Sequence, residues 1–478
     1  YQLRLKARAK SPTRIHISVL NMNRGRVGES SLMLTGSWTS QELVMHIDDP
    51  GHQPGSPYLL KLQPDPGSTV DLARILLFPD DHLDGWEPKV VEMVREAKLP
   101  LLRYPGGNFA SGYHWKDGVG PLDRRPVLAN PAWPIVEWNH VGNDEWMRFC
   151  RLIDAEPMVC VNAGNGTPRE AAEWVLYCNE PATGDLGRLR AVNGHVEPYH
   201  IRWWEVGNEL SGPWQIGHTD AEGYAERYAR FEKPMREADP DIWLVANGQL
   251  RVLQADKIID RGGQEDWNEQ LVKENGEKVR SISVHSLAGG HLREPEDPSG
   301  VWKDLLAYAD HYHHFLDGLV VRPMRDAGLK PVIAITELQA FAKHPALSKA
   351  NNIGGTLWYS AMLNQCIRSE GLIELITHSA LLNHGGGLRK DRGVVFADPV
   401  WWTTYMYSNQ EGTIPVAVTT DSPVFSSAGK YIVKRENIPY LDVMALMAPG
   451  GQTCKVILAN RQEASAMEVE MSLAGFLS

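Results

Sequence analysis

A regular alternation of short apolar runs and amphipathic segments, from about residue 73 to residue 404, constrains the fold of this chain most. The apolar runs are almost continuous, which is typical of strands in a sheet that is covered on its outer face. The eight runs are Ala73–Phe78, Leu101–Tyr104, Pro157–Ala163, Ile201–Val206, Ile242–Ala246, Ser281–His285, Val332–Thr336 and Leu372–Thr377. Strands that alternate with helices form parallel βαβ units, and eight of them favour a closed (β/α)8 barrel over an open sheet.

The two ends of the chain have a different texture. Near the N-terminus, Ile15–Leu20 alternates apolar and polar residues, and turns such as Asp49-Pro50-Gly51 follow. Beyond about residue 405 the helical period stops, and runs such as Tyr440–Met447 are typical of strands. The sequence therefore predicts an α/β protein in three parts: an N-terminal β-sandwich (1–72), a (β/α)8 barrel (73–404) and a C-terminal β-sandwich (405–478).

Composition argues against several classes of protein. The formal net charge of −11 disfavours a nucleic-acid partner, because phosphate backbones select basic surfaces. No run of 18 apolar residues occurs, so no membrane-spanning helix is expected. The five cysteines form no CxxC pattern, which predicts buried free thiols, for example Cys150 and Cys160, rather than a zinc site. The compartment stays open, and because the chain starts at Tyr1 without an apolar signal core, we expect that an upstream part was removed.

Two glutamates stand where predicted strands meet their loops. Glu209 follows the fourth predicted strand and Glu337 ends the seventh. In a (β/α)8 barrel the catalytic groups lie at these carboxyl ends of the strands. Two carboxyl groups can hydrolyse a glycosidic bond, since one donates a proton to the leaving oxygen and the other attacks the anomeric carbon. The sequence therefore predicts a retaining glycoside hydrolase, with environments that split the two pKa values.

Further candidates end other strands. Arg103, which is expected to point inward, needs a carboxylate partner and would keep Glu337 ionised, while Glu209 would keep its proton in a less charged and more desolvated place. Asn108, after two glycines, offers a donor and an acceptor to sugar hydroxyls. His285 is predicted either to orient a catalytic carboxylate or substrate hydroxyl, or to be a structural residue. No His/Asp/Cys cluster has the spacing of metal ligands, so no metal is expected.

Two long strings extend these sites. They are RYPGGNFASGYHWKDGVGP at residues 103–121 and GNELSGPWQIGH at residues 207–218. At these residues the chain resembles glycoside hydrolase family 51, the α-L-arabinofuranosidases of the clan with catalytic acids on strands four and seven. The resemblance implies that Glu209 is the acid/base, Glu337 the nucleophile and Asn208 the ligand of the sugar hydroxyl beside the reacting carbon. It also implies that Asn108 and Trp214 lie in or near the sugar site, that no cofactor is needed, and that the N-terminal sandwich is carbohydrate-binding-like.

Three positions depart from the family pattern. Leu287 stands where the family often has a tyrosine, and Thr336-Glu337-Leu338 replaces the usual Asp-Glu-Trp. A glutamate that many members have in the first strand–helix loop has no clear equivalent. These changes leave the chemistry intact. We also expect the loop 287–300 to line the substrate site.

The resemblance implies an exo-acting α-L-arabinofuranosidase that removes arabinofuranosyl groups from arabinoxylan or arabinan. An endo-acting β-1,4-glucanase or xylanase on the same frame is the alternative enzyme, and an open cleft with several tryptophans would favour it. A non-catalytic carbohydrate-binding protein is the third reading, and it would require one carboxylate to be missing. The expected partner is a polysaccharide or oligosaccharide, with no nucleic acid and no membrane, and a homo-oligomer stays open.

Overall fold

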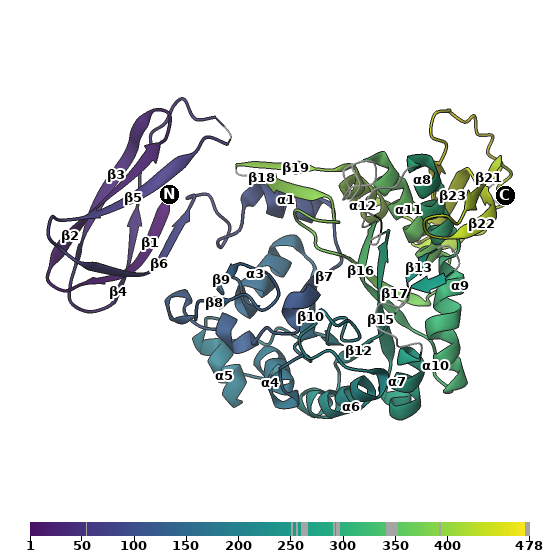
Figure 1. Ribbon diagram of the computed structural model, residues 1–478, viewed down its shortest axis with the longest axis horizontal. Coiled ribbons are helices and arrows are strands. Elements are labelled where there is room, and N and C mark those ends of the chain that lie inside the picture. The colour runs from purple at the N-terminus through teal and green to yellow at the C-terminus, as the bar shows by residue number, and fades with distance from the viewer. Residues whose placement is uncertain are drawn as a thin grey trace.

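Two β-rich ends flank a central α/β region (Figure 1). The computed structural model describes residues 1–53, 55–249, 252–254, 257–259, 266–289, 292, 297–340, 352–391 and 393–473, with backbone alone for 252–254 and 257–259. None of the helices in these ranges is long and apolar enough to cross a membrane.

The N-terminal unit is a sandwich of two antiparallel three-stranded sheets, β4-β1-β6 and β3-β2-β5. Its strands are β1 (Gln2–Ala9), β2 (Thr13–Asn21), β3 (Gly25–Leu34), β4 (Thr39–Val44), β5 (Tyr58–Pro64) and β6 (Val70–Phe78). Every second residue of β1 is buried, from Leu3 to Ala9, and the same holds for Ile15, Ile17 and Val19 of β2. This period of two builds the core between the sheets.

The prediction that Ala73–Phe78 is the first barrel strand is wrong. The run belongs to β6, which pairs antiparallel with β1 and places Leu3 opposite Leu77 and Leu5 opposite Ile75. An apolar run shows that a strand has a covered face, but the partner that covers it is chosen by tertiary contacts. The sandwich therefore extends to Phe78.

The other seven predicted strands form one parallel sheet in the order β17-β16-β15-β12-β11-β10-β7. Their bounds are β7 (Leu101–Tyr104), β10 (Glu156–Val161), β11 (Trp203–Val206), β12 (Trp243–Asn247), β15 (Ser281–Ala288), β16 (Ile333–Ala340) and β17 (Ile373–His378). The sheet is nearly closed and confirms the predicted (β/α)8 fold, with seven strands among the described residues. β7 and β17 are its two edges.

Helices cover the outer face of this sheet (Figure 1). The larger ones are α1 (Pro88–Glu96), α3 (Asn143–Ile153), α4 (Pro168–Asn179), α6 (Ala221–Ala238), α7 (Trp267–Asn275), α8 (Pro298–Asp310), α11 (Ile353–Ile367) and α12 (Pro399–Asn409). α6 shows why they form: it begins after Asp220, whose carboxylate accepts a hydrogen bond from the Gly223 amide, and it buries Tyr224, Tyr228 and Phe231 on one face. Shorter elements are α2 (Gly107–Ala110), α5 (Asp185–Val192), α9 (Tyr312–Leu316), α10 (Arg322–Asp326), β8 (Leu128–Ala129), β9 (Val136–Glu137), β13 (Val252–Gln254), β14 (Lys257–Ile259), β18 (Leu388–Asp391) and β19 (Val394–Ala397).

The C-terminal strands pack against the barrel helices. They are β20 (Ile414–Val416), β21 (Val424–Ala428), β22 (Lys434–Pro439), β23 (Leu441–Met447) and β24 (Cys454–Asn460), in the antiparallel sheets β20-β23-β24 and β21-β22. The buried carboxylate of Asp304 in α8 accepts hydrogen bonds from the amides of Gly429, Tyr431 and Ile432. These three bonds fix the strands on the barrel.

Candidate active site

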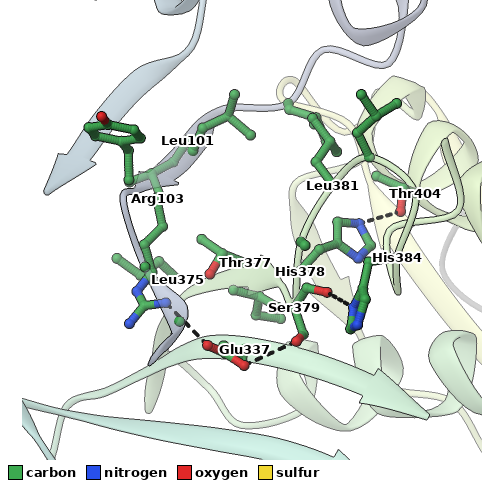
Figure 2. Close-up of a pocket in the computed structure, with 18 of the residues that line it drawn as sticks. Leu101, Arg103, Glu337, Leu375, Thr377, His378, Ser379, Leu381, His384 and Thr404 are labelled. Carbon is green, nitrogen blue, oxygen red and sulfur yellow. Dashed lines mark hydrogen bonds and ion pairs between the residues drawn. The ribbon is translucent and has the colours of Figure 1, made fainter. Parts of the chain in front are cut away.

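A cavity of about 1210 Å³ lies between the edge strands β7 and β17. Leu101, Arg103, Leu375 and Thr377 surround it in Figure 2, and Glu337 lies at its floor in that view. Its lining also includes Leu287 near the end of β15 and residues that follow the carboxyl ends of other strands: Asn108, Trp133, Glu209, Trp214 and Ser379. This is the barrel face at which catalytic groups are expected.

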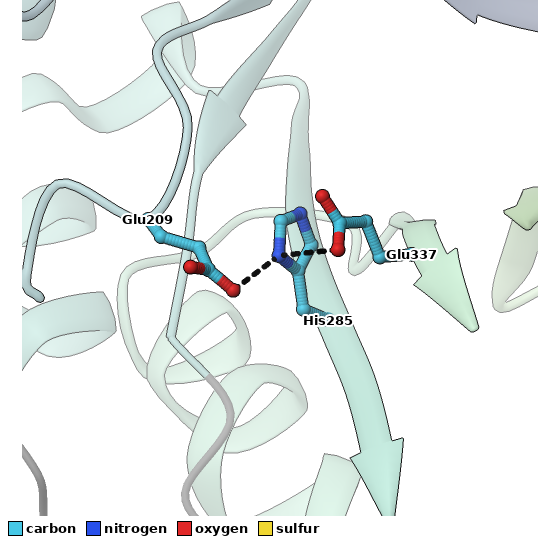
Figure 3. A group of neighbouring side chains, drawn as sticks. All are labelled: Glu209, His285 and Glu337. Atoms are coloured by element: carbon cyan, nitrogen blue, oxygen red, sulfur yellow. Dashed lines mark hydrogen bonds and ion pairs between the residues drawn. The ribbon is translucent and has the colours of Figure 1, made fainter. Parts of the chain in front are cut away.

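Glu209 and Glu337 converge at this face although the sequence separates them widely. One carboxylate oxygen of each, together with a ring nitrogen of His285, lies within 4.8 Å of the others (Figure 3). Glu209 adopts a left-handed backbone conformation, with φ of 46°, directly after the β11 strand and Gly207-Asn208. A non-glycine residue in this region is strained, which is common where a side chain is aimed for function.

Glu337 is held on both of its oxygens. Its Oε1 lies 3.4 Å from Nη1 of Arg103, and its Oε2 accepts a hydrogen bond of 3.0 Å from Oγ of Ser379. Figure 2 shows both contacts. The ion pair supplies positive charge beside the carboxylate, as the sequence predicted for Arg103.

Arg103 connects three acceptors in the barrel interior. Besides Glu337, it donates through Nε to the fully buried Glu205 and through Nη2 to Oδ1 of Asn208, at 2.7 Å. Burial lowers the pKa of Arg103, but the charges of Glu205, Cys160 and Glu337 outweigh burial, so its pKa is raised and the guanidinium stays charged. Gly106 is required here because its backbone has a φ of 65° and a Cβ would lie 2.7 Å from Nη1 of Arg103.

We expect Arg103→Ala to shift the acidic limb of the pH–rate profile to higher pH, because the nucleophile loses its neighbouring positive charge. The same change leaves Glu205 buried without its ion-pair partner, which costs on the order of 3 to 5 kcal/mol of stability. Arg103→Lys keeps the charge but not the fork of donors and is the control, with a smaller shift. Rates measured between acidic and neutral pH on folded protein test this, and an unmoved acidic limb in the alanine variant contradicts it.

The prediction that Glu209 keeps its proton in a more desolvated place than Glu337 is wrong, because the Glu209 side chain is the more exposed of the two, at 21% against 12%. Oε1 of Glu209 lies 2.9 Å from Nδ1 of His285, and its Oε2 accepts a hydrogen bond of 2.8 Å from Nε1 of Trp214. Burial raises the pKa of Glu209, but the hydrogen bonds and charge of His285 and the bond from Trp214 outweigh it and lower the pKa to about 2. Burial lowers the pKa of His285, and the charges of Glu337 and Glu209 outweigh burial and raise it. Without substrate, these opposite pKa shifts favour the proton on the His285 side of the contact.

The two predicted asparagines differ in their surroundings. Asn208 is fully buried, and its Nδ2 has no hydrogen-bond partner among the described residues while its Oδ1 is taken by Arg103. A free amide donor beside Glu209 fits the role of a ligand to a sugar hydroxyl. Asn108 lines the cavity, and its Oδ1 accepts a hydrogen bond of 2.6 Å from Nε2 of Gln215.

Three residues of the site were not predicted from the sequence: Glu205, Thr336 and Ser379. Glu205 is an acid inside an otherwise apolar strand, and this contrast was a usable signal. Ser379 follows β17, so reading the residue after the last strand, as was done for earlier strands, would have found it. Thr336 was noted only as a departure from the family pattern, and its residue type gave no further signal because threonine is common in strands.

The sequence predicts that residues 287–300 line the substrate site, and the structure describes only some of these residues. Leu287 lines the cavity. Residues 290, 291 and 293–296, which include His291, lie outside the described residues, and α8 already begins at Pro298.

The cluster of Glu209, His285 and Glu337 also has the spacing of a cation site. Each group already has a partner of the chain: Nδ1 of His285 is bonded to Glu209, and the guanidinium of Arg103 neutralises Glu337. The donor arrangement fits an acid, a base and their charge partners. That the reaction needs no metal stays a prediction.

Comparison with known proteins shows which family the chain resembles. The model of the alpha-L-arabinofuranosidase 1 domain matches residues 93–278. A probable alpha-L-arabinofuranosidase C of Aspergillus fumigatus is 29% identical over 412 residues, which are 80% of this chain and 77% of that protein. The family 51 alpha-L-arabinofuranosidase structure from Thermotoga petrophila has a TM-score of 0.68 at 29% identity and covers 80% of this chain and 77% of that one. The chain is similar to the alpha-L-arabinofuranosidases of glycoside hydrolase family 51.

A further relative matches a similar share of the chain. The intracellular exo-alpha-(1->5)-L-arabinofuranosidase 1 of Bacillus subtilis is 27% identical over 419 residues, which are 84% of this chain and 80% of that protein. The chain is a glycoside hydrolase, and the reading as a non-catalytic sugar-binding protein is not favoured.

Proposed function

We propose that this chain is an exo-acting α-L-arabinofuranosidase that removes arabinofuranosyl groups from arabinoxylan or arabinan by a retaining double displacement. The observation that carries the proposal is a short distance between the two glutamates. One carboxylate oxygen of Glu209 lies within 4.8 Å of one carboxylate oxygen of Glu337, and both residues line the same cavity. Carboxyl groups about 5 to 5.5 Å apart are typical of retaining enzymes, while inverting enzymes keep a wider gap for water. The names of the relatives, above all the exo-acting enzyme of Bacillus subtilis, support the sugar and the exo mode.

In the first step Glu337 attacks the anomeric carbon. The bond from that carbon to the glycosidic oxygen breaks, and this oxygen takes a proton from Glu209, which receives it from His285 through their 2.9 Å contact. An arabinosyl ester is left on Glu337. Arg103 and Ser379 fix both oxygens of Glu337, so that the nucleophile is oriented before the substrate arrives.

In the second step a water molecule attacks the same carbon and gives its proton to Glu209. The ester bond breaks, Glu337 is again a carboxylate, and two inversions leave arabinose with its original anomeric configuration. Trp214 and Trp133, both about half exposed at the cavity, offer flat faces to the part of the substrate that leaves.

A panel of 4-nitrophenyl glycosides tests the proposal. We expect the α-L-arabinofuranoside to be cleaved, and the β-xyloside and β-glucoside to be cleaved at least about a hundredfold more slowly, because a site that binds sugar hydroxyls rejects misplaced ones strongly. NMR of the first product gives its anomeric configuration. Preferred cleavage of xyloside or glucoside, or an inverted product, would overturn the proposal.

We expect activity to survive prolonged dialysis against a chelator. Two carboxyl groups with their charge partners suffice for this reaction, so no bound cation is needed to activate water or to polarise the substrate. The rate on the arabinofuranoside before and after dialysis checks this. A loss that a divalent ion restores would contradict it.

A further inference from the structure

A β-bulge turns two consecutive side chains of β16 into the barrel. Along the β15–β16 ladder, Val284 pairs with Ile335, but the next residue, His285, pairs with Glu337, so Thr336 is the extra residue. In a regular strand Thr336 and Glu337 would point to opposite faces. The bulge instead lets Glu337 reach Arg103 while Thr336, fully buried, contacts His285 and Glu205.

The hydrogen bonds at Thr336 have fixed directions. Burial raises the pKa of Glu205, but the charges of Arg103 and His285 outweigh it and lower the pKa, so Glu205 is a carboxylate that only accepts. The single hydroxyl proton of Thr336 is therefore donated to Oε1 of Glu205, at 2.8 Å. Its oxygen, 3.1 Å from Nε2 of His285, must accept, and Nε2 must carry a proton.

This tautomer determines what faces the acid/base. With Nε2 protonated, the contact of 2.9 Å between Nδ1 of His285 and Oε1 of Glu209 contains one proton, on either atom. If that proton leaves, the lone pair of Nδ1 faces the Glu209 carboxylate. If the ring instead moves its remaining proton to Nδ1, the lone pair of Nε2 faces the oxygen of Thr336. Both arrangements are repulsive, so the pair retains its proton.

We propose that Thr336 and Glu205 are positioning residues that fix the Nε2-protonated form of His285, so that His285 and Glu209 share the proton that the leaving group receives. The proposal rests on the proposed hydrolase function of the site. In this proposal His285 has a defined role as the residue that shares a proton with Glu209. Glu205 on β11 is the carboxylate that acts on the histidine through the Thr336 hydroxyl.

The charged groups that face His285 come from three strands and the loop after one of them. They are Glu209 after β11, Glu205 on β11, Glu337 on β16 at 3.8 Å from Nδ1, and Arg103 on β7, whose charge opposes protonation. Thr336→Val changes none of these charges and keeps the shape of the side chain. It removes only the acceptor of Nε2 and the donor to Glu205.

The test compares pH–rate profiles of wild type, Thr336→Val and Thr336→Ser. On an arabino-oligosaccharide, which needs protonation of its leaving group, we expect the valine variant to move the basic limb of kcat/KM about one unit lower, roughly a tenfold loss above it. The acidic limb should not move, and serine, which keeps the hydroxyl, should restore the wild-type profile. An unmoved basic limb in valine, or no restoration by serine, would overturn the proposal.

NMR of protein with ¹⁵N-labelled histidine tests the tautomer without relying on activity. The signal of His285 is assigned by its loss in His285→Asn. We expect a protonated Nε2 throughout the neutral range in the wild type, and a proton on Nδ1 of the uncharged ring would contradict the proposal. If Thr336→Val does not fold, this measurement on the wild type still tests the proposal. It also separates the two claims, because a wild type that is inactive on arabinofuranosides refutes the proposed function while the tautomer is still measured.

Discussion

Glu337→Ala is expected to reduce turnover of an aryl arabinofuranoside by on the order of 10⁴-fold to 10⁶-fold, because the variant has no group to form the glycosyl ester. Removal of a nucleophile is the most severe loss that this site can suffer, since both chemical steps pass through its ester. The fold should persist, because Arg103 keeps its bonds to Glu205 and Asn208 when the Glu337 carboxylate is lost.

Added azide separates a lost nucleophile from a damaged site. In Glu337→Ala it should not restore a product of retained configuration, because an external anion attacks only once. Glu374→Ala is the matched control, since this glutamate lines the same cavity from the start of β17, at the opposite end from the chemistry. Near-normal turnover in Glu337→Ala, or an equal loss in the control, would contradict the assignment.

The sequence predicted the sheet well because parallel barrel strands are buried on both faces. Seven of the apolar runs are strands of the barrel sheet, in chain order from β7 to β17. The eighth, Ala73–Phe78, has the same apolar character, yet its Ile75 is 40% exposed and the strand pairs with β1. The apolar pattern of a segment depends on that segment alone. Which sheet the strand joins depends on tertiary contacts with other segments, and the pattern does not show these.

The positions of the main site residues were predictable from the sequence, and the interactions between them were not. Glu209, Glu337 and Arg103 were found because strand ends meet at one face of a barrel. The charge relation between them was not, because it depends on which side chains approach within hydrogen-bond distance. His285 reaches Glu209 across the barrel, and its proton sets the local charge in a way that spacing cannot reveal.

The bulge at Thr336 shows the same limit in the backbone. A sequence that alternates regularly through Ile335, Thr336 and Glu337 predicts that only two of them share a face. The ladder skips one residue there, and a polar side chain that would face the helices enters the interior instead. Bulges of this kind cluster near active sites, because they change the aim of a side chain without ending the strand.

Glu209→Ala is expected to separate substrates by their leaving groups. A 2,4-dinitrophenyl arabinofuranoside needs little protonation, so its first step should stay close to the wild-type rate, while an arabino-oligosaccharide should lose roughly 10²-fold to 10⁴-fold. The second step loses its general base in both cases, so the ester on Glu337 should accumulate and give a burst of dinitrophenol. Azide, which needs no base, should then speed turnover and give an arabinosyl azide of retained configuration.

Loss of the side chain also frees two groups that Glu209 now occupies. Nδ1 of His285 and Nε1 of Trp214 lose their acceptor, so Glu209→Gln, which retains an oxygen for one of them, controls for rearrangement of the site. Both variants should show the same dependence on the leaving group, because neither can donate a proton. If Glu209→Ala instead fails on every substrate and azide gives an inverted product, Glu209 is the nucleophile, and the roles of the two glutamates are exchanged.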